Sequence, residues 1–386
     1  MKDEPYEVPE DEKALCWASI VQAISILSRL QKGLWRGEIR DLKAVVKHAL
    51  GSGNVELSDV PEPVPGPDEV KIEVKAVGIC GSDIHIYHGD IQLPIRPPVV
   101  MGHEFCGVIA EVGSSVSKFK PGERVTSETS AYVCGSCLSC RTGNYNVCAD
   151  KRLIGYWFNG AFAKYCVVPS RLVHRLPENV SFLSGALCEP LACCVNGVIE
   201  KTAISPGDVV VVAGPGTIGL LSLQLVKAKG GFVMLCGTGV DGNRLNLGRE
   251  LGADVTVNIH EQDPVEVMSG LTDGAGADVF IECSGSPDAV RMGFQLVRRG
   301  GRYTQIGLTG SAFELDFDTV AYKELTVKGS LGQRWTSWRR GLKLLAEGVI
   351  RTEPLISDVL PLTEWMTGFR KMEHREGLKV ILEPVL

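Results

Sequence analysis

Four closely spaced cysteines constrain this chain more than any other feature of its sequence: Cys134, Cys137, Cys140 and Cys148. Overlapping CxxC steps let a loop turn back on itself, so that four thiolates surround one tetrahedral zinc ion. A zinc ion with four thiolate ligands keeps no open position, which is typical of a site that holds a loop in shape. The alternative is a set of free thiols. We predict a structural zinc site here.

A second set of metal-binding residue types is dispersed along the chain: Cys80, His103, Glu104 and Glu189. Each has an ordinary explanation of its own, because a lone cysteine after a strand is usually part of a core and a glutamate before Pro190 suits a helix start. Together they suit a zinc ion with three protein ligands and one exchangeable position. Such a zinc ion lowers the pKa of an alcohol and favours the alkoxide from which hydride leaves. The set therefore predicts a catalytic site.

Two further side chains near Cys80 suit the proton transfer that accompanies hydride loss. Ser82 follows Cys80 by two residues, and His85 follows it by five. A serine hydroxyl against the alkoxide can pass a proton through ribose hydroxyls to a histidine at the surface. The alternative for Ser82 is a simple turn hydroxyl. We predict catalytic roles for Ser82 and His85, with Asp83 orienting a metal ligand.

A glycine-rich motif, Gly214-Pro215-Gly216-Thr217-Ile218-Gly219, follows an apolar strand and opens a helical run. In that context G-x-G-x-x-G indicates a dinucleotide site rather than an ordinary turn. The first glycine permits the tight turn, the second lets the backbone approach a pyrophosphate, and the third allows close helix–strand packing. Free N–H groups at the helix start bind the anion. We predict that Gly214, Gly216, Thr217, Ile218 and Gly219 contact the cofactor.

The carboxylate that usually binds the adenosine ribose, about 20 residues further on, is missing from its place. The second strand ends at Thr238, and Asp241 comes late, where it suits a cap for the helix that carries Arg244. Rejection of a 2′-phosphate is weaker without that carboxylate, and Thr238 can donate to a hydroxyl or a phosphate. We predict cofactor contacts by Thr238 and Arg244. The choice between NAD and NADP stays open, with NAD favoured.

The hydrophobic patterns predict an α/β fold with two domains. Residues 42–176 read as short strands, which indicates a mainly β domain. After Pro190, continuous apolar strands alternate with helical runs, which indicates right-handed βαβ units in a doubly wound parallel sheet. The tail contains a helix and a strand over residues 379–384. We predict a catalytic domain of residues 42–192 completed by 333–386, and a nucleotide-binding domain of residues 193–332.

Composition excludes several other classes of protein. The net charge is −6, and no dense basic stripe suggests a nucleic-acid surface. No stretch is long and apolar enough to cross a membrane, and the acidic N-terminus does not resemble a signal peptide. The odd total of 13 cysteines argues against a secreted disulfide scaffold. We expect a cytoplasmic protein that binds neither nucleic acid nor membrane, and a zinc-dependent nucleic-acid or partner-binding module is the distant alternative.

Several segments together resemble one family. GICGSDIH (78–85), GHEFCGVIAEVG (102–113), the cysteine row, CEPLACC (188–194) and GPGTIG (214–219) occur in the order seen in zinc-dependent medium-chain alcohol dehydrogenases. The chain is most similar to the polyol branch, which includes sorbitol (L-iditol) dehydrogenase, over about residues 42–386. The resemblance implies a GroES-like β domain with zinc and a Rossmann domain with a nicotinamide cofactor. It also implies that Cys80, His103 and Glu104 bind the catalytic zinc, and that Glu189 is either a further ligand or accepts from zinc-bound water.

The resemblance also covers two residues that are expected to bind the substrate. Arg334, in GSLGQRW, stands where the polyol enzymes have an arginine that reaches substrate hydroxyls, and Trp335 would line the same pocket. The implied activity is hydride transfer between a secondary alcohol of a polyol and NAD or NADP, with two zinc ions per chain. An L-threonine 3-dehydrogenase or a 2,3-butanediol dehydrogenase is the alternative. Relatives form homodimers or homotetramers, so we expect a homo-oligomer.

Residues 1–41 have no counterpart in the family pattern, which begins near Leu42. One hypothesis is a misplaced start, with translation beginning at a TTG codon for Leu42. The other is a genuine N-terminal extension, in which residues 14–30 form an amphipathic helix.

Overall fold

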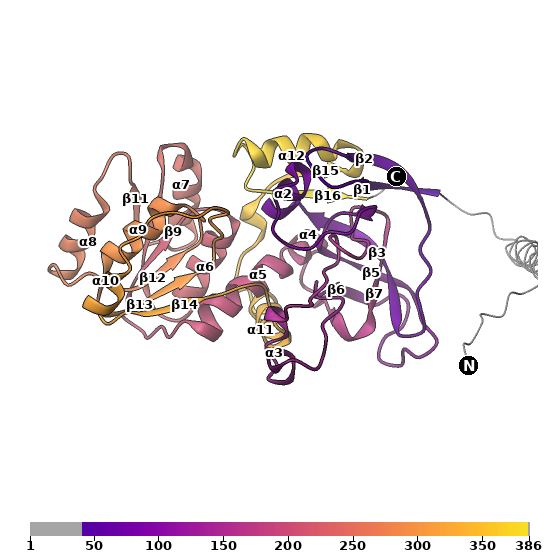
Figure 1. The fold of residues 1–386 in the computed structure, drawn as a ribbon, viewed down its shortest axis with the longest axis horizontal. Helices are drawn as coiled ribbons and strands as arrows, with labels where there is room; N and C mark the ends of the chain where they lie inside the picture. The colour runs from indigo at the N-terminus through magenta and orange to yellow at the C-terminus, as the bar shows by residue number, and fades with distance from the viewer. Residues whose placement is uncertain (1–40, 385–386) are drawn as a thin grey trace, which may run out of the picture. The chain divides into compact units, whose positions relative to one another are not determined.

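The computed structural model describes residues 41–384 (Figure 1). Both hypotheses about the N-terminal extension therefore concern residues outside the described part. The described strands form three sheets, of six, seven and three strands. Within residues 41–384 no helix is long and apolar enough to cross a membrane.

Six parallel strands form one sheet, in the order β11-β10-β9-β12-β13-β14. Numbered along the chain, this order is 3-2-1-4-5-6, the doubly wound arrangement whose ligand crevice lies where the strand order reverses, beside the first strand. The strands are β9 (Val209–Ala213), β10 (Phe232–Gly237), β11 (Val255–Asn258), β12 (Ala277–Glu282), β13 (Val297–Gln305) and β14 (Thr326–Gly329).

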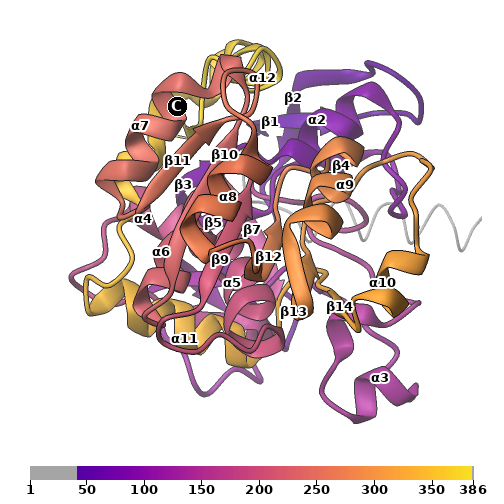
Figure 2. The ribbon, with the colours of Figure 1, turned by 90° about the vertical axis from the view of Figure 1, so that its left-hand side faces the viewer.

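Helices cover both faces of this sheet (Figure 2). They are α6 (Thr217–Ala228), α7 (Gly242–Glu250), α8 (Pro264–Thr272), α9 (Pro287–Leu296) and α10 (Asp318–Tyr322), with the short turn η4 (Gly239–Asp241) before α7. Along β9, Val210 and Val212 belong to one hydrophobic core, whereas Val211 and Ala213 belong to the other. Successive side chains of a strand point to opposite faces, so a strand buried on both faces is apolar at every position.

The β part contains the seven-stranded sheet, in the order β15-β16-β3-β5-β6-β8 with β7 also paired to β3. Its strands are β3 (Glu69–Gly78), β5 (Glu104–Val112), β6 (Arg124–Ser127), β7 (Tyr165–Pro169), β8 (Val173–Arg175), β15 (Ile356–Pro361) and β16 (Lys379–Glu383). The third sheet consists of β2 (Val55–Pro61), β1 (Asp41–Lys47) and β4 (Val99–Val100). The predicted return of the tail is visible in Figure 1, where β16 lies beside the much earlier strand β3.

Further helices pack on or between these sheets. They are α2 (Gly81–His88), α3 (Leu138–Arg141), α4 (Phe182–Ala186), α5 (Cys188–Cys194), α11 (Trp335–Ala346), α12 (Trp365–Glu373), the π-helical turn η3 (Val195–Lys201), and the 3₁₀ turns η1 (Tyr145–Val147), η2 (Ser170–Leu172), η5 (Glu353–Leu355) and η6 (Leu362–Glu364). One hydrophobic core joins β9 to Leu191 of α5, Trp338 of α11 and Ile381 of β16. The parallel sheet and the β part therefore share buried apolar surface.

The predicted fold class, a doubly wound parallel sheet with a mainly β second part, is confirmed. The predicted strand over residues 232–237 matches β10, and the predicted helix from Thr217 ends one residue earlier than expected, at Ala228. The residue limits of the two domains stay a prediction.

Candidate active site

The pairing of β3 with β5 brings together side chains that are more than 20 residues apart in sequence. Gly78, the last residue of β3, pairs with Glu104, the first residue of β5. Cys80 follows as the residue that begins α2, and His103 immediately precedes β5. As a result, one ligand atom each from Cys80, His103 and Glu104 lies within 4.8 Å of the others. The antiparallel register is thus the physical cause of the cluster.

The His103 imidazole is buried beside acidic groups. Its Nδ1 lies 3.6 Å from Oδ1 of the fully buried Asp83, and neither atom has a hydrogen-bond partner among the described residues. Burial alone would lower the pKa of His103, but Tyr156, Asp83 and Cys80 together raise the pKa well above its ordinary value. The other oxygen of Asp83 accepts from the Cys80 backbone N–H at 2.9 Å. Asp83 therefore fixes the start of α2 and faces the ring of a candidate ligand.

Glu104 forms a buried ion pair at the edge of the cluster. Its Oε2 lies 2.6 Å from Nζ of Lys379, and both side chains are at most 3% exposed. Lys379 also donates to the Ile79 carbonyl at 3.0 Å. Burial by itself would lower the pKa of Lys379, but Glu104 holds the pKa above its ordinary value. Only one oxygen of Glu104 is occupied by Lys379, so the second remains for a metal.

Glu189 lies near the cluster but is not one of its three members. Its Oε1 accepts from Nε2 of Gln333 at 3.0 Å, and the same nitrogen donates to Oγ1 of Thr129 at 3.0 Å. Burial raises the pKa of Glu189 to about 7, and the charges of His103 and Glu104 also act on it. Of the two roles predicted for Glu189, this placement favours an acceptor beside the metal over a direct ligand.

The predicted relay residues both lie on α2, where Ser82 is half-buried and His85 is exposed. The Ser82 hydroxyl accepts from the Tyr156 phenol at 2.7 Å, and the Tyr156 ring lies 5.4 Å from the His103 ring. His85 lies on the exposed side of the helix, where its Nδ1 is 3.0 Å from Oδ1 of Asp90. Ser82 is therefore connected to the His103 ring through Tyr156, and His85 lies at the surface. The proton relay itself stays a prediction.

The donors of the cluster fit zinc. A thiolate, an imidazole and a carboxylate are the three ligand types that zinc takes in proteins, and catalytic sites combine three of them with one open position. The three side chains converge from two adjacent strand ends and need no rearrangement of the backbone. We regard this cluster as a candidate catalytic metal site.

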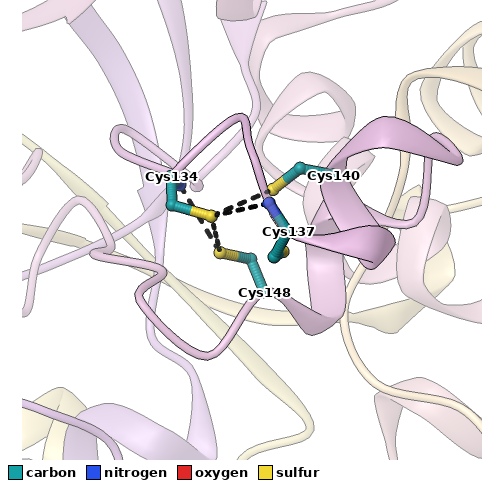
Figure 3. A group of neighbouring side chains, drawn as sticks. All are labelled: Cys134, Cys137, Cys140 and Cys148. Atoms are coloured by element: carbon teal, nitrogen blue, oxygen red, sulfur yellow. Dashed lines mark hydrogen bonds between the residues drawn. The ribbon is translucent and has the colours of Figure 1, made fainter.

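The four cysteines of the row form a second cluster, in a segment that we call the cysteine lobe (residues 134–148). Figure 3 shows the side chains of Cys134, Cys137, Cys140 and Cys148 pointing toward one another, and their sulfurs lie within 4.8 Å. Sγ of Cys134 is 3.9 Å from that of Cys140 and 3.6 Å from that of Cys148. With Zn–S bonds of about 2.3 Å, a tetrahedral site has sulfurs about 3.8 Å apart. The lobe is therefore shaped for zinc.

Hydrogen-bond donors stabilise the thiolate of one of the four cysteines, Cys134. The Cys137 N–H donates to Sγ of Cys134 at 3.4 Å, and hydrogen bonds from Cys137 and Ser136 lower the pKa of Cys134 to about 6. Thiolates rather than thiols bind zinc, so this bond favours the binding form. None of the twelve cysteines within residues 41–384 forms a disulfide.

The two residues predicted to line the substrate pocket have other contacts. The Arg334 guanidinium pairs with Oε2 of Glu200 at 2.6 Å and donates to Oδ1 of Asn144 at 3.0 Å. The Trp335 side chain is 47% exposed, and the Arg339 guanidinium lies 4.9 Å from its ring. Within residues 41–384 no hydrogen bond or ion pair joins Arg334 or Trp335 to Cys80, His103 or Glu104, and their substrate-binding role stays a prediction. Gln333, one residue earlier, is the member of this segment that reaches Glu189.

The glycine motif forms the turn between β9 and α6. Gly214 has a φ of +96°, and a Cβ at Gly219 would lie 1.8 Å from the Gly214 carbonyl oxygen. No atom lies within 4 Å of a Cβ position at Gly216, so the outer side of the loop is open. These are the three glycine roles of a dinucleotide loop. The loop fits a pyrophosphate, with Thr217 and Ile218 supplying the first N–H groups of α6.

Thr238 and Arg244 are engaged inside the protein. The N–H and the hydroxyl of Thr238 both donate to Oδ2 of Asp241, at 2.9 and 2.7 Å. Arg244 donates to the Gly377 carbonyl at 2.7 Å, and its Nη1 is 3.6 Å from Oδ1 of Asp241. Asp241 precedes α7 as expected, but its carboxylate binds Thr238 rather than the first N–H groups of the helix. A carboxylate therefore does stand just beyond the end of β10.

Sequence reasoning missed Lys379, Gln333 and Tyr156. Lys379 begins a strand whose next three residues are apolar and buried, and a buried lysine there signals a buried partner. Gln333 precedes a helix, and Tyr156 lies in a glycine-bounded turn, so neither has a local pattern that indicates a site. All three act through contacts with distant segments.

Comparison with known proteins identifies the family. Residues 66–178 match the model of the alcohol dehydrogenase GroES-like domain, and residues 217–347 match that of the zinc-binding dehydrogenase. A sorbitol dehydrogenase of Halalkalibacterium halodurans is 41% identical over 345 residues, which cover 89% of this chain and 100% of that protein. A D-arabitol-phosphate dehydrogenase of Enterococcus avium is 39% identical over 345 residues, 89% of this chain and 98% of that one.

A crystal structure of a Sinorhizobium meliloti 1021 protein bound to NADP agrees in fold, with a TM-score of 0.83 and 34% identity over 89% of this chain and 100% of that chain. This chain therefore belongs to the zinc-dependent medium-chain alcohol dehydrogenase family and is an oxidoreductase. The family predicted from the sequence motifs, with its GroES-like and Rossmann parts, is confirmed.

Proposed function

We propose that this protein transfers hydride between a secondary alcohol of a polyol and NAD, at a zinc ion held by Cys80, His103 and Glu104. The observation that carries the proposal is the convergence of these three donors within 4.8 Å, with the Ser82 hydroxyl beside them. The similarity to a sorbitol dehydrogenase and to a D-arabitol-phosphate dehydrogenase supports a polyol as the substrate.

A bound zinc ion would supply Lewis acidity that lowers the pKa of the substrate alcohol. The protein contributes the remaining steps. Ser82 takes the alcohol proton as it gives up its own, and the exposed His85 is the surface group through which a proton can leave to solvent. Glu189, held by Gln333, stands beside the three donors and can accept from a polar hydrogen there. Asp83, whose Oδ1 lies 3.6 Å from Nδ1 of His103, would orient the His103 ring.

The cysteine lobe supplies a second, structural zinc site, so we propose two zinc ions per chain. The four sulfurs lie within 4.8 Å of one another, and a zinc ion bound by all four would keep no free position for substrate. Loss of this zinc should therefore act on the shape of the lobe and its neighbours rather than on the reacting atoms.

The proposed cofactor preference rests on Asp241. Its carboxylate binds both donors of Thr238, just after β10, where the adenosine ribose lies in doubly wound folds. A fixed carboxylate there repels a 2′-phosphate, which favours NAD. Arg244, 3.6 Å from Asp241, opposes this effect in part, but its guanidinium is directed to the Gly377 carbonyl.

The proposal is tested by measuring reduction of NAD and of NADP with sorbitol, xylitol, other hexitols and pentitols, D-arabitol phosphate, L-threonine and 2,3-butanediol. Each assay is repeated after treatment with a zinc chelator. We expect chelator-sensitive oxidation of a polyol, with a higher kcat/KM for NAD than for NADP. Selective oxidation of L-threonine or 2,3-butanediol would replace the substrate class, and activity that survives complete zinc removal would overturn the role of Cys80, His103 and Glu104.

A further inference from the structure

Tyr156 is a buried residue at the candidate site to which the proposed mechanism assigns no role. Its side chain is 3% exposed, its hydroxyl is 2.7 Å from the Ser82 hydroxyl, and its ring packs 5.4 Å from that of His103. It lies in the turn of residues 153–158, far in sequence from α2. A buried phenol that is paired with a predicted proton acceptor needs an explanation.

The chemistry of the two hydroxyls sets the direction of the bond. A phenol is a far stronger acid than an aliphatic alcohol, with an ordinary pKa of about 10, so the favoured arrangement has Tyr156 donating to the Ser82 oxygen. A hydroxyl that accepts one bond still has its own proton to donate. Within residues 41–384 the Ser82 hydroxyl has no other protein partner, so that proton is available to a ligand.

The turn that carries Tyr156 is held in place by the backbone. The Trp157 N–H donates to the Leu153 carbonyl at 2.9 Å, and the Gly155 N–H donates to the Phe158 carbonyl at 2.8 Å. The Arg96 N–H donates to the carbonyl of Tyr156 itself, also at 2.9 Å. These bonds fix the Cα of Tyr156, and packing against His103 fixes its ring, so the phenol oxygen has little freedom to move away from Ser82.

We propose that Tyr156 is a positioning residue for hydride transfer, whose hydroxyl donates to Ser82 and so directs the remaining lone pair of the Ser82 oxygen toward the reacting alcohol, while the Ser82 proton points away from the alcohol and can be passed on. The proposal rests on the role of Ser82 in the proposed function. Without Tyr156, the Ser82 hydroxyl would rotate freely and would also populate orientations that do not face the reacting alcohol. Tyr156 then acts through Ser82 and does not itself touch the reacting atoms.

The test uses Tyr156→Phe, which keeps the ring against His103 and removes only the hydroxyl. We expect kcat for polyol oxidation to fall roughly tenfold, as part of the 10²–10⁴-fold that a positioned proton-transfer group contributes, with KM changed by less than about twofold. A rise in KM at constant kcat would instead make Tyr156 a substrate contact and overturn the proposal. Tyr303→Phe is the matched control, because it removes another buried phenol, which donates to Gln305 in the parallel sheet.

A double-mutant cycle then asks whether Tyr156 acts through Ser82. Ser82→Ala should lower kcat roughly a hundredfold. Tyr156→Phe added to Ser82→Ala should cost nothing further, because the group that it positions is gone. If the second change again lowers kcat roughly tenfold, the two residues act independently and the proposal is wrong.

A measurement without substrate tests the Tyr156–Ser82 hydrogen bond independently of the proposed activity. In protein labelled with ¹³Cζ-tyrosine, the Tyr156 resonance is assigned by its loss in Tyr156→Phe, and we expect it to shift in Ser82→Ala. An unshifted resonance would show that the hydrogen bond is absent and would overturn the proposal. A shifted resonance in an enzyme that oxidises no alcohol would instead preserve the hydrogen bond and overturn the proposed function, together with any positioning role in it.

Discussion

At the scale of single residues, the ion pair between Glu104 and Lys379 is the most costly feature of the site. The two residues lie on β5 and β16, with β3 between them. A Cβ at Gly78 of β3 would lie 2.5 Å from the Glu104 carboxylate, so the absence of a side chain there leaves room for the pair. Removing both charges from water costs free energy, and their mutual attraction offsets that cost only while both partners are present.

We predict that Lys379→Met lowers the free energy of unfolding of the metal-free protein by about 3–5 kcal/mol, because the buried Glu104 carboxylate loses its partner. Urea unfolding of chelator-treated protein measures this loss. The control is Arg291→Met, which breaks the exposed pair Arg291–Asp288 and should cost less than about 1 kcal/mol. A loss for Lys379→Met no larger than for the control would show that the Glu104 carboxylate does not depend on the lysine.

At the scale of elements, the cysteine lobe holds the segment that carries Gln333. Asn146 donates to the Leu331 carbonyl at 2.7 Å, and the Tyr145 hydroxyl accepts from the Trp335 N–H at 2.6 Å. Gln333, between these two anchors, donates to Glu189. The shape of the cysteine lobe is therefore connected to the position of Glu189 through one short segment.

We predict that Cys140→Ser increases hydrogen exchange at the Trp335 amide roughly tenfold or more, because a lobe without zinc no longer fixes the Tyr145 hydroxyl. Hydrogen exchange followed by mass spectrometry of peptides that cover residues 331–335 measures the effect. Thr142→Ala is the control, because its hydroxyl bonds only groups inside the lobe: it donates to the carbonyls of Leu138 and Ser139 and accepts from the side-chain amide of Asn144. Equal protection in Cys140→Ser and wild type would mean that the segment is held without the zinc site.

Local sequence patterns predict individual strands, helices and turns well. They do not predict side-chain contacts that depend on which strands pair and in what register. Strand β10 and the glycine turn follow from an apolar run and from backbone requirements that are local. Cys80 and His103 were predicted as partners from their chemistry and from the family resemblance. The contacts of Tyr156 with Ser82 and of Lys379 with Glu104 join residues 74 and 275 positions apart, and no local pattern encodes which strands pair or in what register.

At the scale of the whole described molecule, residues 377–379 connect the nucleotide-binding part to the Cys80–His103–Glu104 cluster. The Thr217 hydroxyl, at the start of α6, donates to the Leu378 carbonyl at 3.0 Å, and Arg244 donates to the Gly377 carbonyl. The next residue, Lys379, pairs with Glu104. Three consecutive residues around the start of β16 thus contact the glycine loop, α7 and the Cys80–His103–Glu104 cluster.

The proposal of one catalytic and one structural zinc site is tested most directly by two measurements on the same samples: the zinc content per chain and the rate of NAD reduction with the preferred polyol. We predict two zinc ions in the wild type, one zinc ion and no activity in His103→Gln, and one zinc ion with activity retained in part in Cys140→Ser. Full activity in His103→Gln, with its zinc content reduced, would contradict the assignment of Cys80, His103 and Glu104 as the catalytic metal site.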